Sequence, residues 1–445
     1  MTLTRSLLED YVAIRDISPA AKAAVAIALA DGLAVMVAAS GLEPAVAPVL
    51  AYASASGAGP STLIGSGRKV SPVMAAIGNG ALAHAIDFED TFGEGKIHPN
   101  ASLIPSVLAL AEAESRSGAE VIRALSLGCD FACRLSLALD GDPAKRGWYH
   151  PPILSGLGAT LGCCLLFDLD AGTSLNALGL FAAQFMLADE LKRSPLSHLR
   201  AVREGFAARA AVEAALLARA GVVAVEQPLE GPGGVFPILT GHAPRQSAFA
   251  GIGRHFYGPE VGVKQWPSCR GTHSAIVAAQ RLRERGVTPS DVTQVTVSVS
   301  APNDMLFVPR QQRIAPQTAI DAKFSIPFVF ATALDGEDVD LASFTPERLA
   351  SDNTLELASR IYMEAAPPPP GIEAVYTLRA TTGISITETV EAVPGLRTAD
   401  TTLEGIAPKL KACLAAGKKP VDCRPLLSAV ARLETDGPGD LIRLL

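Results

Sequence analysis

The segment that follows Gly80 brings together residue types that general acid–base chemistry uses. An imidazole, three carboxylates and a hydroxyl fall within eight positions, at His84, Asp87, Glu89, Asp90 and Thr91. A second imidazole, His98, follows after the turn Gly93-Glu94-Gly95. Ionisable clusters beside apolar runs are where pKa values depart from those in water. The segment therefore predicts a proton-transfer site, with an ordinary surface loop as the alternative.

Two helices are expected to position this cluster. A helix over 71–88 would carry His84 and Asp87 three positions apart on one face, near its end. Pro99 then leads into a second helix over 102–116, so His98 lies at a helix entrance. Free amide groups there favour anions, and an imidazole beside them can stay neutral and act as a base.

Two further segments offer candidates at helix starts. His150 is followed by two prolines, so its imidazole and the phenol of Tyr149 lie on a rigid turn, where a structural histidine is the competing interpretation. Arg200 and Arg203 lie three apart at the start of an expected helix, where the dipole disfavours cations. An anionic partner held by a guanidinium fork explains this placement, and a solvated cationic face is the alternative.

The segment 262–273 is the fourth candidate. Arg270 and the free amides of a helix start predict anion binding, with Lys264 and His273 close in sequence. A simply capped helix would account for Thr272 but not for the cations.

Composition and missing motifs exclude several classes. A formal charge of -7, a pI near 5.6 and the lack of a basic tract argue against a nucleic-acid partner. The seven cysteines form no CxxC pair, and no nucleotide-binding loop, HExxH motif or serine elbow occurs, so no metal and no cofactor is predicted. The apolar stretch 153–169 is shorter than the roughly 20 residues that span a bilayer, and charges interrupt the first 16 residues. We therefore expect a cytoplasmic protein with no membrane partner.

The length and the hydrophobic pattern predict a mainly α fold in two domains. With 445 residues, 49% hydrophobic and 5% aromatic, the chain suits closely packed helices rather than a β sandwich. Alternation over 292–299, 376–381 and 384–390 predicts strands, and helical periodicity returns after Asp400. We expect a large discontinuous all-α helical-bundle domain, residues 1–263 and 403–445, and a smaller α+β domain, residues 264–402.

Six motifs together resemble the MmgE/PrpD family, which includes 2-methylcitrate dehydratase, cis-aconitate decarboxylase and iminodisuccinate epimerase. They are His84-Ala-Ile-Asp87-Phe-Glu-Asp90-Thr91, His98-Pro-Asn, Gly147-Trp-Tyr-His150-Pro, Gly205-Phe-Ala-Ala-Arg209, Lys264-Gln-Trp-Pro-Ser-Cys269-Arg-Gly-Thr-His273 and Ala322-Lys323-Phe324-Ser325-Ile-Pro. The resemblance implies a cleft between the two domains and a homodimer. It places cleft residues at Asp87, Thr91, His98, His150, Lys264 and His273.

The chain departs from the family pattern at three positions. Arg200 stands where a lysine is common, Arg203 replaces a nearby histidine, and Glu89 replaces an aspartate. Arginine stays charged and binds carboxylates, whereas a buried lysine can lose its proton. The exchange therefore favours water elimination or epimerisation over a lysine-dependent decarboxylation.

These observations predict a cofactor-independent lyase that removes a proton next to a carboxylate of a small di- or tricarboxylate and eliminates water. His98 and His150 are the candidate base and acid, Asp87 orients an imidazole, and His273 completes the cleft. The predicted substrate-binding residues are Thr91, Lys264, Arg200, Arg203, Arg270 and Tyr149. Epimerisation of an iminodisuccinate-like dicarboxylate, a cis-aconitate-type decarboxylation and a non-catalytic helical interaction protein are the alternatives.

Overall fold

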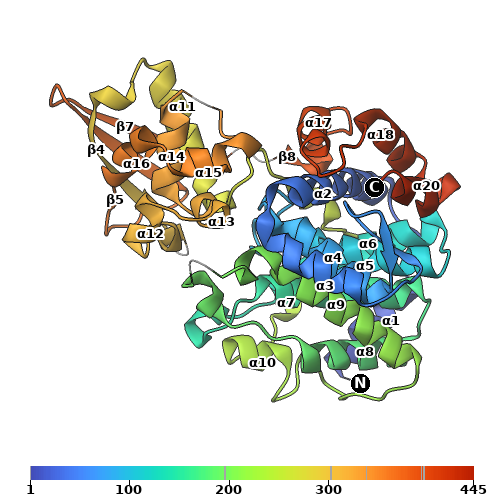
Figure 1. The fold of residues 1–445 in the computed structure, drawn as a ribbon. Coiled ribbons are helices and arrows are strands. Elements are labelled where there is room, and N and C mark those ends of the chain that lie inside the picture. The colour runs from blue at the N-terminus through green and yellow to red at the C-terminus, as the bar shows by residue number, and fades with distance from the viewer. Residues whose placement is uncertain (1, 195–196, 301–302, 337, 392, 394–395) are drawn as a thin grey trace.

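Most of the chain forms one helical body, to which both ends of the chain belong (Figure 1). The computed structural model describes residues 2–194, 197–300, 303–336, 338–391, 393 and 396–445. The helices of this body are α1 (Leu3–Ala13), α2 (Pro19–Leu42), α3 (Ala47–Ala55), α4 (Pro72–Ala85), α5 (Pro99–Ala113), α6 (Gly118–Leu137), α7 (Pro151–Leu166), α8 (Ala171–Gln184), α9 (Leu199–Arg219), α10 (Val235–Thr240), α17 (Ala407–Ala415), α18 (Cys423–Ala431), α19 (Leu433–Asp436) and α20 (Pro438–Arg443). The return of the C-terminal helices makes the body discontinuous in sequence.

Local signals in the sequence start these helices. The hydroxyls of Ser18 and Ser71 cap α2 and α4, and a proline occupies the first helical position of each. Ser117 and Glu120 form a capping box at the start of α6. The helices expected over 71–88 and 102–116 are α4 and α5, whose observed bounds differ from these by at most three residues.

Helix α2 runs through the core of this body, and α17 packs on it. By length and composition it could cross a membrane, but 78% of its most apolar window is buried inside the protein. The core helix of a soluble protein passes the same test, so this helix is weak evidence for a membrane span.

The second body contains a four-stranded sheet. Its strands are β4 (Val292–Val299), β5 (Ile361–Met363), β6 (Ala374–Ala380) and β7 (Ser385–Val390), in the order β5-β4-β6-β7. Its helices are α11 (His273–Glu284), α12 (Arg310–Ile314), α13 (Ala319–Lys323), α14 (Ile326–Leu334), α15 (Pro346–Leu349) and α16 (Asp352–Ser359). The hydroxyl of Tyr376 on β6 forms a 2.8 Å hydrogen bond with that of Ser274 on α11. Its ring stacks on that of Phe330 on α14, with 5.6 Å between the ring centres, so these two helices cover one face of the sheet.

A short two-stranded ladder lies between the two bodies (Figure 1). Strand β3 (Gly262–Val263) pairs antiparallel with β8 (Leu396–Arg397), so the chain enters and leaves the second body at one place. The residues that enter there, from Lys264 onward, are those predicted to bind an anion.

The structure confirms a mainly α fold with a small sheet region, and it corrects several details. The hairpin of β1 (Ser61–Leu63) and β2 (Arg68–Val70) lies in a stretch expected to be helical, and the parallel edge strand β5 was not expected. Strands β1, β2 and β5 have three residues each, too few for a clear alternation of apolar and polar residues. The predicted domain limits stay predictions.

Candidate functional site

The loop after α4 turns sharply at Asp87. Helix α4 ends at Ala85, and Asp87 has a left-handed backbone with φ 51°. The expectation that His84 and Asp87 share a helical face was therefore wrong. The amide of Asp87 donates to the carbonyl of His84 at 2.8 Å, which closes the turn. A non-glycine residue in this region is strained and persists where its surroundings hold it.

Glu89 connects the two imidazoles of the segment. Its Oε1 lies 2.6 Å from Nδ1 of His84 and 3.1 Å from Nδ1 of His98. His98 Nδ1 also lies 2.8 Å from the carbonyl oxygen of Asp90, so this nitrogen carries the proton and donates it. Nε2 of His98 then has the free lone pair. Burial lowers the pKa of His98 to about 4, which leaves the imidazole neutral at pH 7.

Lys264 brings a buried positive charge to the same loop from the second body. Its Nζ lies 2.5 Å from Oδ1 of Asp87, donates to the Asp87 carbonyl at 3.0 Å, and lies 3.8 Å from Glu89. Burial favours the neutral forms, but the attraction between the partners outweighs it, so the pKa of Lys264 is raised and that of Asp87 is lowered. Asp87 thus holds a lysine, and the residue that orients the imidazoles is Glu89, not Asp87 as expected.

Four side chains of the loop could in principle ligate a metal ion. His84, Asp87, Glu89 and His98 offer ligand atoms within 4.8 Å of one another. The ammonium of Lys264 already contacts both carboxylates. A lysine in this place supplies the positive charge that the two acids require, and it competes with a metal cation for them.

A cavity of about 270 Å³ lies beside this centre. It is lined by Thr91, Phe92, Gly93, Glu94, Glu260, Gly262, Val263, Lys264, Arg270, His273, Val393 and Arg397. Drug-sized ligands occupy pockets of roughly 300–1,000 Å³, so this cavity suits a smaller molecule. The backbones of Thr91 and Gly262 hydrogen-bond each other at 2.9 and 2.7 Å and fix the loop after α4 against strand β3.

Four of the predicted site residues line the cavity: Thr91, Lys264, Arg270 and His273. Both terminal nitrogens of Arg270 donate to Glu373, at 2.7 and 3.5 Å, and Nη2 also donates to the Val393 carbonyl at 3.4 Å. The ring of His273 lies edge-on to Trp266 and bonds the Ser268 carbonyl at 3.2 Å through Nε2. Burial, and then the charge of Arg270, lowers the pKa of His273 to about 3.

Arg200 and Arg203 are both buried at the start of α9. Nη1 of Arg203 donates to the Arg200 carbonyl at 2.5 Å. Nε and Nη2 of both arginines have no hydrogen-bond partner within the described part of the chain. The guanidinium of Arg200 stacks on Phe324 at 3.4 Å, and that of Arg203 lies 4.9 Å from the ring of Tyr149. Unpartnered buried guanidiniums are costly unless an anion joins them.

His150 contacts the loop between α4 and α5 through a hydrogen bond with the backbone of Gly95. It precedes α7, and burial followed by the charge of Lys192 lowers its pKa to about 4. None of the contacts of the described residues joins His150 to His98 or Lys264. The structure therefore does not make His98 and His150 a contacting base–acid pair, although Tyr149 beside His150 reaches Arg203.

Two functional candidates were missed as individual residues. Glu89 was part of the predicted cluster but was given no role of its own, yet it contacts both imidazoles. Lys323 is buried, donates to the Pro267 carbonyl at 2.9 Å, and has its pKa lowered by burial to about 7. A single lysine within the apolar run Ala322–Pro327 is the signal that could have drawn attention to it.

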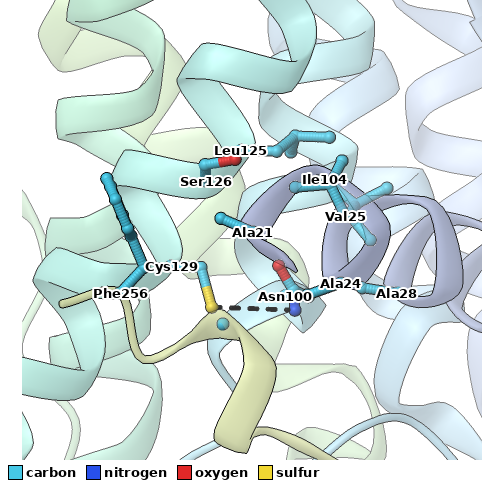
Figure 2. A pocket seen from close by; sticks show the side chains of 11 residues that line it. Ala21, Ala24, Val25, Ala28, Asn100, Ile104, Leu125, Ser126, Cys129 and Phe256 are labelled. Carbon is cyan, nitrogen blue, oxygen red and sulfur yellow. Dashed lines mark hydrogen bonds between the residues drawn. The ribbon is translucent and has the colours of Figure 1, made fainter. Parts of the chain in front are cut away.

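A second layer of polar groups supports the loop. Asn100 donates to Oδ2 of Asp90 at 2.5 Å, and burial raises the pKa of Asp90 to about 7. Figure 2 shows Asn100 and Cys129 facing each other in a crevice between helices, with 4.0 Å between Nδ2 and Sγ. This crevice holds about 10 Å³, room for one water at most, so it is no substrate site.

The fold and the site define a class of protein. It has a helical body and a smaller body with a sheet, and buried carboxylates, imidazoles and a lysine lie together where the two bodies meet. Family models of the MmgE/PrpD N-terminal domain and the MmgE/PrpD C-terminal domain match residues 10–247 and 266–434. The chain belongs to the MmgE/PrpD family.

Similar proteins of known description include a cis-aconitate decarboxylase-like protein of Aspergillus oryzae, 26% identical over 67% of this chain and 66% of that protein. The cis-aconitate decarboxylase of Aspergillus terreus is 25% identical over 68% of this chain and 66% of its own length. That of Homo sapiens is 24% identical over 67% and 63%. The matched regions thus span about two thirds of these relatives.

Proposed function

We propose that this protein is a cofactor-independent lyase that abstracts a proton next to a carboxylate of a small di- or tricarboxylate and eliminates water. One observation carries the proposal: a neutral imidazole, His98, is held by Glu89 beside the ammonium of Lys264 and a small cavity. An aligned neutral base and a fixed cation are what carbon-acid chemistry needs.

In this mechanism Nε2 of His98 takes the proton from the carbon. Lys264 lies where negative charge develops on the adjacent carboxylate and stabilises it. The C–O bond then breaks, and the departing hydroxide takes a proton from a second imidazole, His273 in the cavity or His150. A bound polyanion raises the pKa of these imidazoles, because negative charge favours imidazolium. The substrate thereby helps to supply the acid.

The remaining carboxylates of the substrate need cations of their own. The unpartnered nitrogens of Arg200 and Arg203 and the cavity face of Arg270 are the groups available, with Tyr149 and Thr91 as hydroxyl donors. Arg200 has no ion pair among the described residues, and Arg203 has only the 3.7 Å contact with Glu204, so both can take further carboxylate partners.

Decarboxylation is the second candidate. Similarity to cis-aconitate decarboxylases supports it, and so does Lys323, whose pKa near 7 would let an amine exchange a proton. Here the C–CO₂ bond breaks and the carbanion takes a proton. Epimerisation would instead return a proton to the opposite face of the same carbon.

The test begins with a panel of small polycarboxylates screened by thermal shift. The binder that stabilises the protein most is incubated in D₂O, with product followed by NMR. Alkene formation supports elimination, CO₂ release supports decarboxylation, and deuterium in unreacted substrate without alkene supports epimerisation. His98→Gln should lower kcat by about 10²–10⁴-fold, as the loss of a general base does.

His242→Gln is the matched control, because His242 is exposed and lies outside the cavity. It should leave kcat unchanged. Turnover that persists in His98→Gln would contradict the role of His98. A protein that binds and converts none of the polycarboxylates would support the non-catalytic alternative instead.

We also propose a homodimer in the cytoplasm. The dimer follows from the family resemblance, and the location follows from the sequence pattern.

A further inference from the structure

Lys409, on the C-terminal helix α17, reaches the loop that carries Asp87 and Glu89. Its Nζ donates to the carbonyl of Phe88 at 2.8 Å and lies 4.0 Å from the centre of the Phe88 ring. The two residues are 321 positions apart in sequence. The same ammonium is paired with Asp31 of α2 at 2.6 Å.

Two lysines therefore hold two consecutive carbonyls of one strained turn. Lys264 donates to the carbonyl of Asp87 at 3.0 Å, and Lys409 donates to that of Phe88. Asp87 has its left-handed φ of 51° at this point. A strained conformation of this kind persists only when contacts over-determine it, and these two bonds come from residues 177 and 321 positions away in sequence.

The charges around the loop also require Lys409. Asp87, Glu89, Asp90 and Asp31 are buried acids beside one another, and Lys264, Lys323 and Lys409 act on them. The side chain of Asp31 is 1% exposed and that of Lys409 is 10% exposed, so water screens this pair little. Without Lys409, Asp31 and Asp90 would lose a cation that lowers their proton affinity.

We propose that Lys409, braced by Asp31, is a positioning residue that fixes the turn at Asp87–Glu89 and so aligns the carboxylates that hold Lys264 and His98. The C-terminal segment thereby takes part in the site and does more than complete the helical body. This inference rests on the proposed function for its kinetic readout.

The test compares Lys409→Met and Lys409→Arg with two controls on the same helix. Lys411→Met removes an exposed lysine, and Leu410→Ala destabilises α17 without touching the loop. Lys409→Met should lower kcat by about 10- to 100-fold with KM changed less than about threefold, because small misplacements of reacting groups have effects of this size. Lys409→Arg should recover part of kcat.

Hydrogen–deuterium exchange of peptides covering 84–98 gives a readout that needs no substrate. Exchange should rise in Lys409→Met and stay as in the wild type in Lys411→Met and Leu410→Ala, all measured well below Tm. The proposal is overturned if exchange is unchanged in Lys409→Met, or if the folded Lys409→Met variant has the same kcat as the wild type. If the wild type converts no polycarboxylate, the proposed function fails, and exchange alone decides the role of Lys409.

Discussion

The buried carboxylates of this protein differ in proton affinity because their neighbours differ. Asp87 has a lowered pKa because Lys264 contacts it directly. Glu204 is fully buried, and the nearest guanidinium nitrogen, Nε of Arg203, lies 3.7 Å from its Oε1. Its other oxygen accepts from Ser102 at 2.5 Å. Burial prevails there and raises the pKa of Glu204 to about 7.

Replacing Glu204 by Gln should therefore change how stability depends on pH. A raised pKa in the folded state means that stability is fully present below the unfolded pKa near 4.5 and is lost as pH rises through about 7. Glu204→Gln removes this loss. As the pH rises from 5 to 8, the Tm of the variant should therefore rise relative to that of the wild type. The change corresponds to roughly 3 kcal/mol in the free energy of unfolding.

Glu213→Gln on the same helix is the control, because Glu213 is partly exposed and its partner Arg209 lies on the surface side of α9. It should show no comparable gain. A Tm difference between Glu204→Gln and wild type that is the same at pH 5 and pH 8 would show that Glu204 does not titrate in this range.

Among the elements, the contact between α4 and α9 matters most for the site. Gly205 on α9 faces the backbone of α4, where an added Cβ would lie 2.3 Å from the carbonyl oxygen of Ile77. A Cβ added at Gly80 on α4 would lie 2.9 Å from both the carbonyl oxygen of Glu204 and the Cα of Gly205. This close approach sets the ends of both helices, which carry His84 on one and Arg200 and Arg203 on the other.

Gly205→Ala should therefore destabilise the protein by about 1–3 kcal/mol, the usual range for overpacking, and also weaken polycarboxylate binding. Urea unfolding and ligand-induced thermal shift measure the two effects. Gly233→Ala is the control, since nothing lies within 4 Å of its added Cβ. Normal stability in Gly205→Ala would mean that the helices separate without penalty.

At the scale of the whole molecule, the site draws on segments from both bodies. The loop between α4 and α5 carries Asp87 to His98, α9 carries the two arginines, and the second body supplies Lys264 to His273. The pairing of Thr91 with Gly262 joins them. The cavity therefore depends on how the two bodies are held together.

The family resemblance predicts that the molecule is a homodimer. Light scattering at micromolar concentration should give about twice 46.1 kDa. A mass of one chain across the concentration range would refute this prediction. Because the described site contains residues of a single chain, a monomer would leave the proposed chemistry untouched.

Much of the fold could be predicted from the sequence, because periodicity and capping residues are local signals. Strand β4 was predicted at its observed limits, and the hairpin of β6 and β7 turns at Gly383, whose φ is 83°. The end of α4 was misplaced, because the turn at Asp87 is held by lysines 177 and 321 positions away from the residues they bind. No local pattern records such contacts.

The site shows the same division. Residue types and motifs predicted which segments carry the chemistry, and the family models confirm the resemblance to the MmgE/PrpD family over most of the chain. The roles of the individual residues stay predictions. Only the tertiary structure decided that Glu89 holds the imidazoles, that Asp87 holds Lys264, and that His150 reaches the backbone of Gly95 in the loop before His98. Hydrogen bonds and ion pairs depend on distances of a few ångströms between distant segments, and sequence spacing does not fix those distances.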